Sequence, residues 1–204
     1  MTPTSFGFRY GRARGALLVV LVCAVAGCKG GKDLPDLGGV PPFAMADQAG
    51  KPFTNETVRG KPWAAAFVFT RCPSVCPRVT KVMREVQVRA KDAKVDLRLV
   101  SFSVDPDNDT PEVLRRYATE YGADLATWSF VTGDSKSVRE TAEKGFKIAV
   151  EGSPDPSKAD FGLTHGTQLV LVDPEMRIRG YYTTADEQAR QNLVNDARGL
   201  AAGR

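Results

Sequence analysis

A continuous apolar run, Trp63-Ala-Ala-Ala-Phe-Val-Phe-Thr70, limits the folds open to this chain of 204 residues. A run of this length without polar alternation is typical of a strand that is buried on both faces of a sheet. The residues after Pro77 then repeat apolar side chains at helical spacing, namely Val79, Val82, Met83 and Val86. We therefore expect an α/β domain in which helices cover both faces of a sheet.

The rest of the chain alternates between strand and helix patterns. Strands are expected at 97–104, 128–131, 167–173 and 177–182, helices from Thr110, at 135–144 and at 184–198, and a small hairpin at 43–53. This order indicates a mixed central sheet flanked by helices, with an N-terminal hairpin extension. The thioredoxin-like arrangement fits the order, and so do other small α/β sandwiches.

The first 27 residues have the pattern of an export signal. Three arginines precede an apolar run of 11 residues at 16–26, which as a helix would rise about 16 Å, half of a hydrocarbon core of about 30 Å. A basic segment, a short apolar segment and small residues together are typical of a bacterial secretory signal. The end of this segment, Val25-Ala-Gly-Cys28, resembles the lipobox of bacterial lipoproteins, in which the cysteine becomes the lipidated first residue.

These patterns divide the chain into three parts. We expect a lipoprotein signal peptide at 1–27, a lipidated tether at 28–42 that is rich in Gly, Pro, Asp and Lys, and a folded domain at 43–204. The alternative at Cys28 is an ordinary cleavage site that lies beside a cysteine. Acyl chains on Cys28 would hold the domain at a membrane surface, because each buried methylene contributes about 0.8 kcal/mol.

The charge of the domain excludes one class of partner. The chain has 28 basic and 24 acidic side chains, but 1–27 contains three arginines and no acid, so 25 basic side chains remain. A near-neutral domain lacks the basic surface that nucleic-acid binding requires. We therefore expect no nucleic-acid partner.

Two cysteines are the most informative residues of the domain. Cys23 lies in the signal segment and Cys28 is the expected lipid site, which leaves Cys72 and Cys76. Exported thiols pair unless they are reduced or bind a metal. Residues spaced i, i+4 share a helix face, and these two follow a buried strand, where α/β folds place their sites. The start of the following helix favours the thiolate form.

Several kinds of site use two such cysteines. A structural disulfide would close a very short loop and contribute little stability. Zinc commonly takes four ligands, whereas the domain offers two cysteines and a single histidine, His165. Two thiolates and one imidazole suit copper. His165 lies in the loop Gly162-Leu-Thr-His-Gly-Thr167, and the sequence alone does not establish that this loop meets the cysteines.

Two redox enzymes and one cation site are further alternatives. A thiol–disulfide oxidoreductase would use Cys72 and Cys76 as its redox pair, but such enzymes have Cys-x-x-Cys and a proline where this chain has His165. A peroxidase needs further groups around its cysteine, and Arg71 alone is weak support. The alternating carboxylates Asp105, Asp107 and Asp109 lack the Gly and Glu of an EF-hand, so a solvated turn and helix cap is the expectation there.

The segment Phe69-Thr-Arg-Cys-Pro-Ser-Val-Cys-Pro77 resembles the metal-binding motif of the SCO/SenC proteins, which are copper chaperones for cytochrome oxidase assembly. Further matches occur in the same order between about 50 and 182, and they are Ser103-Val-Asp-Pro106, Asp109-Thr-Pro111, Tyr121-Gly122, Trp128 and the block from His165 to Pro174. The resemblance implies a thioredoxin-like fold with Cys72, Cys76 and His165 as copper ligands. It also implies delivery of copper to the dinuclear centre of a respiratory oxidase.

The resulting prediction is an exported, lipid-anchored copper chaperone that faces the periplasm and is not primarily an enzyme. It would bind Cu(I) or Cu(II), receive copper from a periplasmic donor or electrons from a thiol reductant, and contact the copper-site subunit of the oxidase. The alternative is an oxidoreductase that reduces the cysteines of that subunit. The chain departs from the family pattern at Arg71, at Ser74, where an acidic residue is frequent, and in its lipid anchor, where a transmembrane helix is common.

Overall fold

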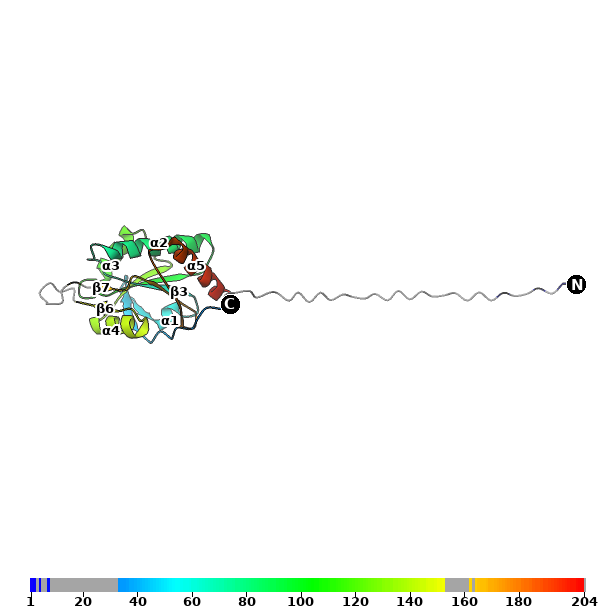
Figure 1. Ribbon diagram of the computed structural model, residues 1–204, viewed down its shortest axis with the longest axis horizontal. Helices are drawn as coiled ribbons and strands as arrows, with labels where there is room; N and C mark the ends of the chain where they lie inside the picture. The colour runs from blue at the N-terminus through cyan, green and yellow to red at the C-terminus, as the bar shows by residue number, and fades with distance from the viewer. Residues whose placement is uncertain (3, 5–6, 8–32, 153–161, 163, 204) are drawn as a thin grey trace. The chain divides into compact units, whose positions relative to one another are not determined.

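The computed structural model describes residues 1–2, 4, 7, 33–152, 162 and 164–203 of the chain. The described residues from Asp33 onward form one compact unit (Figure 1). Cys28 and nearly all of the expected signal segment lie outside the described residues, so these predictions stay predictions. In the described part of the chain, no helix is both long and apolar enough to cross a membrane.

A mixed sheet forms the centre of this unit, as the element order predicted. Its strands are β1 (Ala44–Asp47), β2 (Pro52–Thr54), β3 (Trp63–Val68), β4 (Arg98–Ser103), β5 (Trp128–Thr132), β8 (Leu169–Val172) and β9 (Ile178–Tyr182), in the spatial order β2-β1-β5-β4-β3-β8-β9. The three central strands β3, β4 and β5 run parallel, and β8, β9, β1 and β2 are antiparallel to their neighbours.

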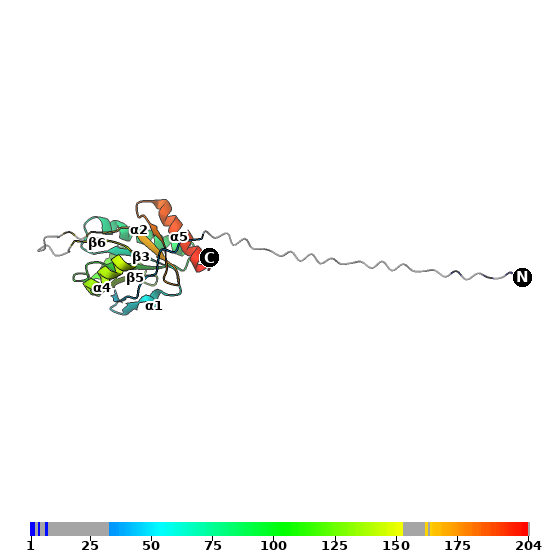
Figure 2. The same cartoon turned by 60° about the horizontal axis from the view of Figure 1, so that its bottom comes forward.

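Helices cover both faces of the sheet (Figures 1 and 2). One layer contains α2 (Val75–Asp92), α3 (Pro111–Glu120) and α5 (Glu187–Ala201). The other contains α1 (Asn55–Val58) and α4 (Ser135–Glu140), which continues as the π-turn η1 (Thr141–Gly145). The two layers explain why β3, at the centre of the sheet, is apolar along its whole length.

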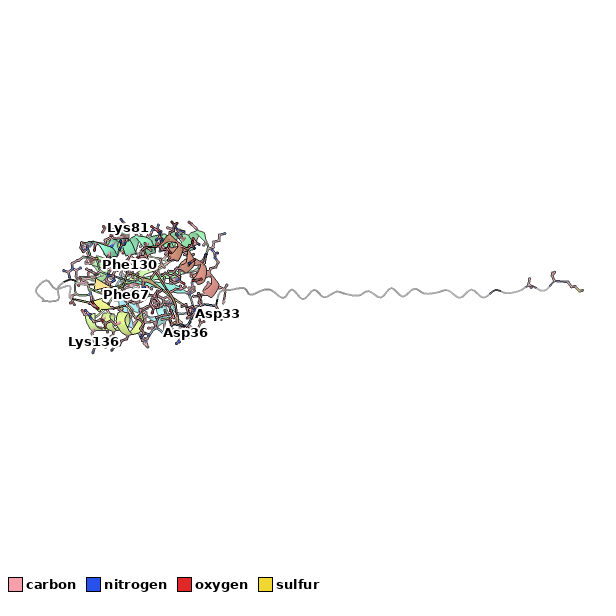
Figure 3. The ribbon with its side chains drawn as sticks, in the orientation of Figure 1. Asp33, Asp36, Phe67, Lys81, Phe130 and Lys136 are labelled. Carbon is pink, nitrogen blue, oxygen red and sulfur yellow. The ribbon has the colours of Figure 1, made fainter. Side chains whose placement is uncertain are left out.

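Aromatic side chains fill the space between the sheet and its two layers. Phe67 of β3 stacks on Phe102 of β4 with 5.2 Å between ring centroids, and both rings pack against Phe146 after η1. Phe130 of β5 instead packs against Tyr117 of α3 on the opposite face. Figure 3 labels both Phe67 and Phe130. All six residues of β3 are buried, which confirms the interpretation of the apolar run.

Some local elements differ from the expectations. Helix α2 begins at Val75 rather than after Pro77, so Cys76 lies in its first turn. The short helix α1 and the two-stranded hairpin of β6 (Val150–Glu151) and β7 (Thr164–His165) were not expected, because elements of two to four residues are too short to show a period.

The segment before Phe43 also differs from a free tether. Val40 is buried, and Gly39 forms a bridge with Arg177 just before β9. Arg177 also makes an ion pair with Asp36, with 2.8 Å between Nη2 and Oδ2. The folded unit therefore begins well before residue 43, and the part of the expected tether from Leu34 to Pro42 packs on the domain.

Candidate metal centre

The two cysteines lie where β3 ends and α2 begins. Cys72 follows the strand by four residues and is 7% exposed, whereas Cys76 occupies the first turn of α2 and is fully buried. Neither cysteine is in a disulfide. The parallel order β3-β4-β5 places this loop at the carboxyl edge of the sheet, as the sequence predicted.

The sulfur of Cys72 occupies the position of a helix cap. Ser74 at the N-cap makes no side-chain hydrogen bond with the helix, and the first turn of α2 contains no acidic residue. The backbone N–H of Cys76 instead donates to Cys72 Sγ at 3.4 Å. Burial raises the pKa of the Cys72 thiol, but the amides of Cys76, Ser74 and Val75 together with the Cys76 thiol outweigh it, so the net pKa is lowered.

Cys76 has the opposite character. Burial is the largest influence and raises the pKa of its thiol far above the usual range, and the neighbouring thiol of Cys72 adds to the rise. Its Sγ lies 3.2 Å from Nε2 of His165, a residue 89 positions away in the sequence. The structure therefore brings the expected histidine to the expected cysteine.

His165 presents an unprotonated nitrogen to this thiol. Its Nδ1 lies 3.0 Å from the carbonyl oxygen of Gly166, and because a carbonyl only accepts, Nδ1 carries the proton. Burial lowers the pKa of the imidazole more than the Gly166 carbonyl raises it. The ring is therefore neutral near pH 7, and the lone pair of Nε2 accepts the S–H of Cys76.

The β6–β7 hairpin holds His165 at this place. Val150 pairs with His165, and the amide of Gly166 donates to the carbonyl of Ala149 at 3.3 Å. A Cβ atom on Gly166 would lie 3.2 Å from Cγ2 of Ile148, so glycine allows the close approach of the two chains. The ring of Phe69 packs edge-on against the imidazole, with centroids 5.9 Å apart.

Two carboxylates that were expected in a solvated turn are buried instead. Asp109 accepts hydrogen bonds from the amide and hydroxyl of Thr70, at 3.0 and 2.5 Å, and from the hydroxyl of Ser103 at 2.6 Å. Asp105 is fully buried and makes an ion pair with Arg71. The expectation of a solvated turn was wrong for both residues, because their partners Thr70 and Arg71 lie more than 30 residues away and leave no trace in the local sequence pattern.

These carboxylates fasten the cysteine loop to the neighbouring strand. Thr70 and Arg71 directly precede Cys72, and both bind residues that follow β4. Burial raises the pKa of Asp105, and the Arg71 guanidinium opposes this rise. Asp107 is exposed, so the three aspartates do not converge on a cation site.

The donor set at this edge fits a soft metal ion. Cys72 contacts Cys76, and Cys76 contacts His165, which gives two sulfur donors and one imidazole nitrogen. In the described part of the chain, no three His, Cys, Asp or Glu side chains already form a closed ligand cluster. A second candidate site for a hard cation is not supported, because the neighbouring carboxylates are occupied by their own partners.

A family model described as SCO1/SenC matches residues 34–201 of the chain. The chain belongs to the SCO1/SenC family. A SCO1 protein homolog of Bacillus subtilis is 32% identical over 185 residues, which cover 89% of this chain and 92% of that protein. The SCO1/SenC resemblance inferred from the cysteine motif is thus confirmed.

Solved structures of SCO proteins share the fold. A SCO1/SenC family lipoprotein from Bacillus anthracis is 31% identical with a TM-score of 0.75, covering 81% of this chain and 97% of that one. BsSco, a member of the Sco family of cytochrome c oxidase assembly proteins in which a disulfide switch was identified, is 30% identical with a TM-score of 0.72, covering 85% and 98%. Bradyrhizobium japonicum ScoI with copper bound is 26% identical with a TM-score of 0.60, covering 76% and 98%. The fold is the thioredoxin-like fold that was predicted.

Proposed function

We propose that this SCO1/SenC protein is a membrane-anchored copper chaperone that binds copper through Cys72, Cys76 and His165 and delivers it to a copper centre of cytochrome c oxidase during assembly. The contact between Cys76 Sγ and His165 Nε2, 3.2 Å apart, carries this proposal. Two segments 89 residues apart in the sequence bring these two atoms together. Packing of the core does not require a thiol to face an imidazole nitrogen, whereas a metal site does.

The protonation states of the three proposed ligands suit an ion that is bound and then transferred. Nε2 of His165 already has a free lone pair, so this ligand binds without losing a proton. The thiols must release theirs, and the lowered pKa of Cys72 makes that sulfur the first ligand. Two thiolates and an imidazole would hold Cu(I) in three-fold coordination. On transfer, Cu(I) passes to the recipient's ligands without a change in oxidation state, and the two thiols regain protons from solvent.

The relatives support the proposed copper recipient, cytochrome c oxidase, and the proposed lipid anchor. BsSco belongs to the cytochrome c oxidase assembly proteins, and ScoI of Bradyrhizobium japonicum binds copper. The Bacillus anthracis relative is a lipoprotein. By the same reasoning we propose that 1–27 is removed, that Cys28 is lipidated, and that the domain faces the periplasm. A periplasmic copper donor, or a thiol reductant that keeps the cysteines reduced, completes the expected set of partners.

Copper binding by the reduced protein without oxygen tests the proposal. We expect one equivalent of Cu(I), nearly complete loss of binding in Cys72→Ala and Cys76→Ala, and weaker binding in His165→Ala. With Cu(II), a thiolate-to-copper charge-transfer band should appear in the wild type and collapse in His165→Ala. Lys136→Ala, on the opposite layer, is the control variant. Tight one-to-one binding that survives in the double cysteine variant would contradict the assignment.

A second function, thiol–disulfide exchange, is favoured by the asymmetry of the cysteines. Cys72 has the lowered pKa of an attacking thiol, and Cys76 lies one helical turn away as a resolving thiol. Cys72 would attack a disulfide of the partner, Cys76 would release the mixed disulfide, and two electrons and two protons would pass to the partner. Rapid reduction of a partner disulfide, together with a failure to bind copper, would assign the protein to the oxidoreductases instead.

A further inference from the structure

We propose that Arg71, Arg78 and Lys81, here called the cationic rim, form a docking surface for an acidic patch on the protein that receives copper. The proposal rests on the chaperone function above and adds the surface and charge through which the recipient is recognised. The rim borders the cysteines on both sides in the sequence, since Arg71 precedes Cys72 and Arg78 follows Cys76 by two residues.

Arg71 is held in a fixed position beside the site. Its Nε and Nη2 both donate to Oδ2 of Asp105, at 3.0 and 2.8 Å. The Asp105 side chain is 0% exposed, whereas the Arg71 side chain is 49% exposed. A guanidinium has five N–H donors, so three remain, and they have no hydrogen-bond acceptor among the described residues.

A guanidinium fixed in this way is preorganised for binding a partner. Ordering a long side chain at an interface costs about 0.5–1.5 kcal/mol, and the ion pair with Asp105 has already imposed that order. Arginine is enriched among the residues that dominate interface energies. Carboxylate is the group that its free N–H donors match best. These properties point to a carboxylate on the partner.

The first half of α2 extends the positive surface. Arg78 and Lys81 are exposed, lie three residues apart on the outer side of the helix, and make no ion pair within the described residues. Figure 3 shows Lys81 on the side of α2 that faces away from the sheet. From Thr70 to Arg84 the chain contains no acidic residue, and the next one, Glu85, is paired with Arg190.

These charges do not serve the helix itself. A cation in the first turn opposes the helix dipole and costs about 0.3–1 kcal/mol, and Arg78 lies in that turn. The exposed carboxylate of the neighbouring loop, Asp107, accepts from Ser135 of α4, on the opposite layer. Asp105 already balances the charge of Arg71, so the surplus positive charge of the rim comes from Arg78 and Lys81, and it favours encounter with a negative partner surface.

The position of the chain entry argues for a protein partner rather than a lipid surface. Gly39 bridges to Arg177, and the turn before Arg177 receives a hydrogen bond from Gly60 just before β3. The cysteines follow the opposite end of β3, which spans about 20 Å. Asp33 and Asp36 accordingly lie at the far end of the unit from β7 (Figures 1 and 3). An anchor before residue 33 thus attaches to the end that is remote from the site.

Copper transfer from the full chain tests the rim. The Cu(I)-loaded chain is reconstituted in phosphatidylcholine vesicles, and the acceptor is the copper-free copper-site domain of a cytochrome c oxidase. The first variant carries four substitutions, namely Arg71→Gln, Arg78→Gln, Lys81→Gln and Asp105→Asn. We expect it to lower the second-order transfer rate at low salt by about tenfold. High salt should remove the difference, because it screens exposed charges. The variant Arg78→Gln/Lys81→Gln leaves the Arg71–Asp105 ion pair intact and should lose part of the transfer rate.

Matched controls separate the outcomes. Lys51→Gln/Lys136→Gln removes two exposed charges from other parts of the unit, the same net change as in both rim variants, and should transfer at the wild-type rate. Dithiothreitol, a small uncharged Cu(I) acceptor, needs no docking, so Arg78→Gln/Lys81→Gln and the lysine control should lose copper to it at the wild-type rate. Failure of copper binding in the wild type would refute the chaperone function, whereas unchanged transfer by the rim variants would overturn the rim alone.

Two further results would overturn the rim as a protein-docking surface. Slower release to dithiothreitol in Arg78→Gln/Lys81→Gln would show that these charges act on the copper site. A loss of transfer that occurs only in vesicles containing anionic phosphatidylglycerol would assign the rim to the lipid surface.

Discussion

At the scale of single residues, the site depends on an unequal pair of thiols. Cys72 faces the amides at the start of α2, which lower its pKa, whereas Cys76 is enclosed by apolar side chains, which raise its pKa. Cys72 precedes α2 and Cys76 lies in its first turn, so the two thiols differ in chemistry although they are only four residues apart. A copper ion must displace a proton from Cys76 at any pH near neutrality.

The affinity for Cu(I) is predicted to rise with pH. Because Cys76 keeps its proton well above neutral pH, each pH unit should strengthen binding about tenfold where Cys72 is already a thiolate, and about a hundredfold at lower pH where both thiols must release a proton. Competition with a Cu(I) chelator at a series of pH values measures the slope. The slope of His165→Ala should be unchanged, since the pKa of this imidazole is lowered and the ring is already neutral. A pH-independent affinity would show that Cys76 is not a ligand.

Asp109 is predicted to be the most sensitive residue outside the metal donors. Asp109→Ala leaves the Thr70 amide and the hydroxyls of Thr70 and Ser103 without their acceptor, so we expect a loss of about 3 kcal/mol in the free energy of unfolding. Copper affinity should fall as well, because Thr70 positions the segment before Cys72. Urea unfolding and chelator competition measure the two effects. Asp107→Ala, at an exposed position, should change stability by less than about 0.5 kcal/mol.

The candidate ligands could be named from the sequence, but their geometry could not. Cys72, Cys76 and His165 are rare residue types in distinctive positions, so composition and motif were enough to single them out. The buried roles of Asp105 and Asp109 depend on contacts with Thr70 and Arg71, which only the crossover between β3 and β4 brings near. No local periodicity encodes such contacts.

At the scale of elements, the start of α2 is predicted to couple helix stability to pH. In a Cys76→Ala background, Cys72 has a lower pKa in the folded than in the unfolded chain, so its stabilisation is complete above the unfolded pKa, near 9. This stabilisation is lost as the pH falls through the pKa that Cys72 has in the folded chain. The free energy of unfolding should therefore increase by about 1 kcal/mol between neutral pH and about pH 9, a typical cap contribution. Chemical denaturation of reduced protein measures the rise, which should be absent in Cys72→Ala/Cys76→Ala.

The longer elements followed from the sequence because their hydrophobic patterns span several periods. The apolar run gave β3, and Thr110 with Pro111 gave the start of α3, where the Thr110 hydroxyl accepts from Val113. The β6–β7 hairpin has two residues in each strand and was missed, although it holds His165. Its position depends on the fit of Gly166 against Ile148, which is a tertiary contact.

At the scale of the whole molecule, the segment before residue 43 is predicted to be part of the folded unit. A chain that starts at Pro41 loses buried Val40, the Asp36–Arg177 ion pair and the carbonyls of Leu34 and Pro35 that Arg179 contacts. We expect its free energy of unfolding to fall by about 2–3 kcal/mol relative to a chain that starts at Asp33. Urea unfolding compares the two chains. Equal stability would restore the view of 28–42 as a free tether.

The attachment of the chain at one end of the sheet also predicts how the site is presented. The N-terminal segment reaches the start of β3 and the cysteines follow its end, about 20 Å away, so a domain anchored through Cys28 should hold the site away from the lipid. Asp33→Cys and Ser74→Cys, each in a Cys72→Ser/Cys76→Ser background, provide positions for a fluorophore at the two ends. In vesicles with a quencher on the lipid headgroup, the label at 33 should be quenched and the label at 74 should not. Equal quenching would mean that the domain lies flat on the bilayer, with the cysteines beside the lipid rather than open to a protein partner.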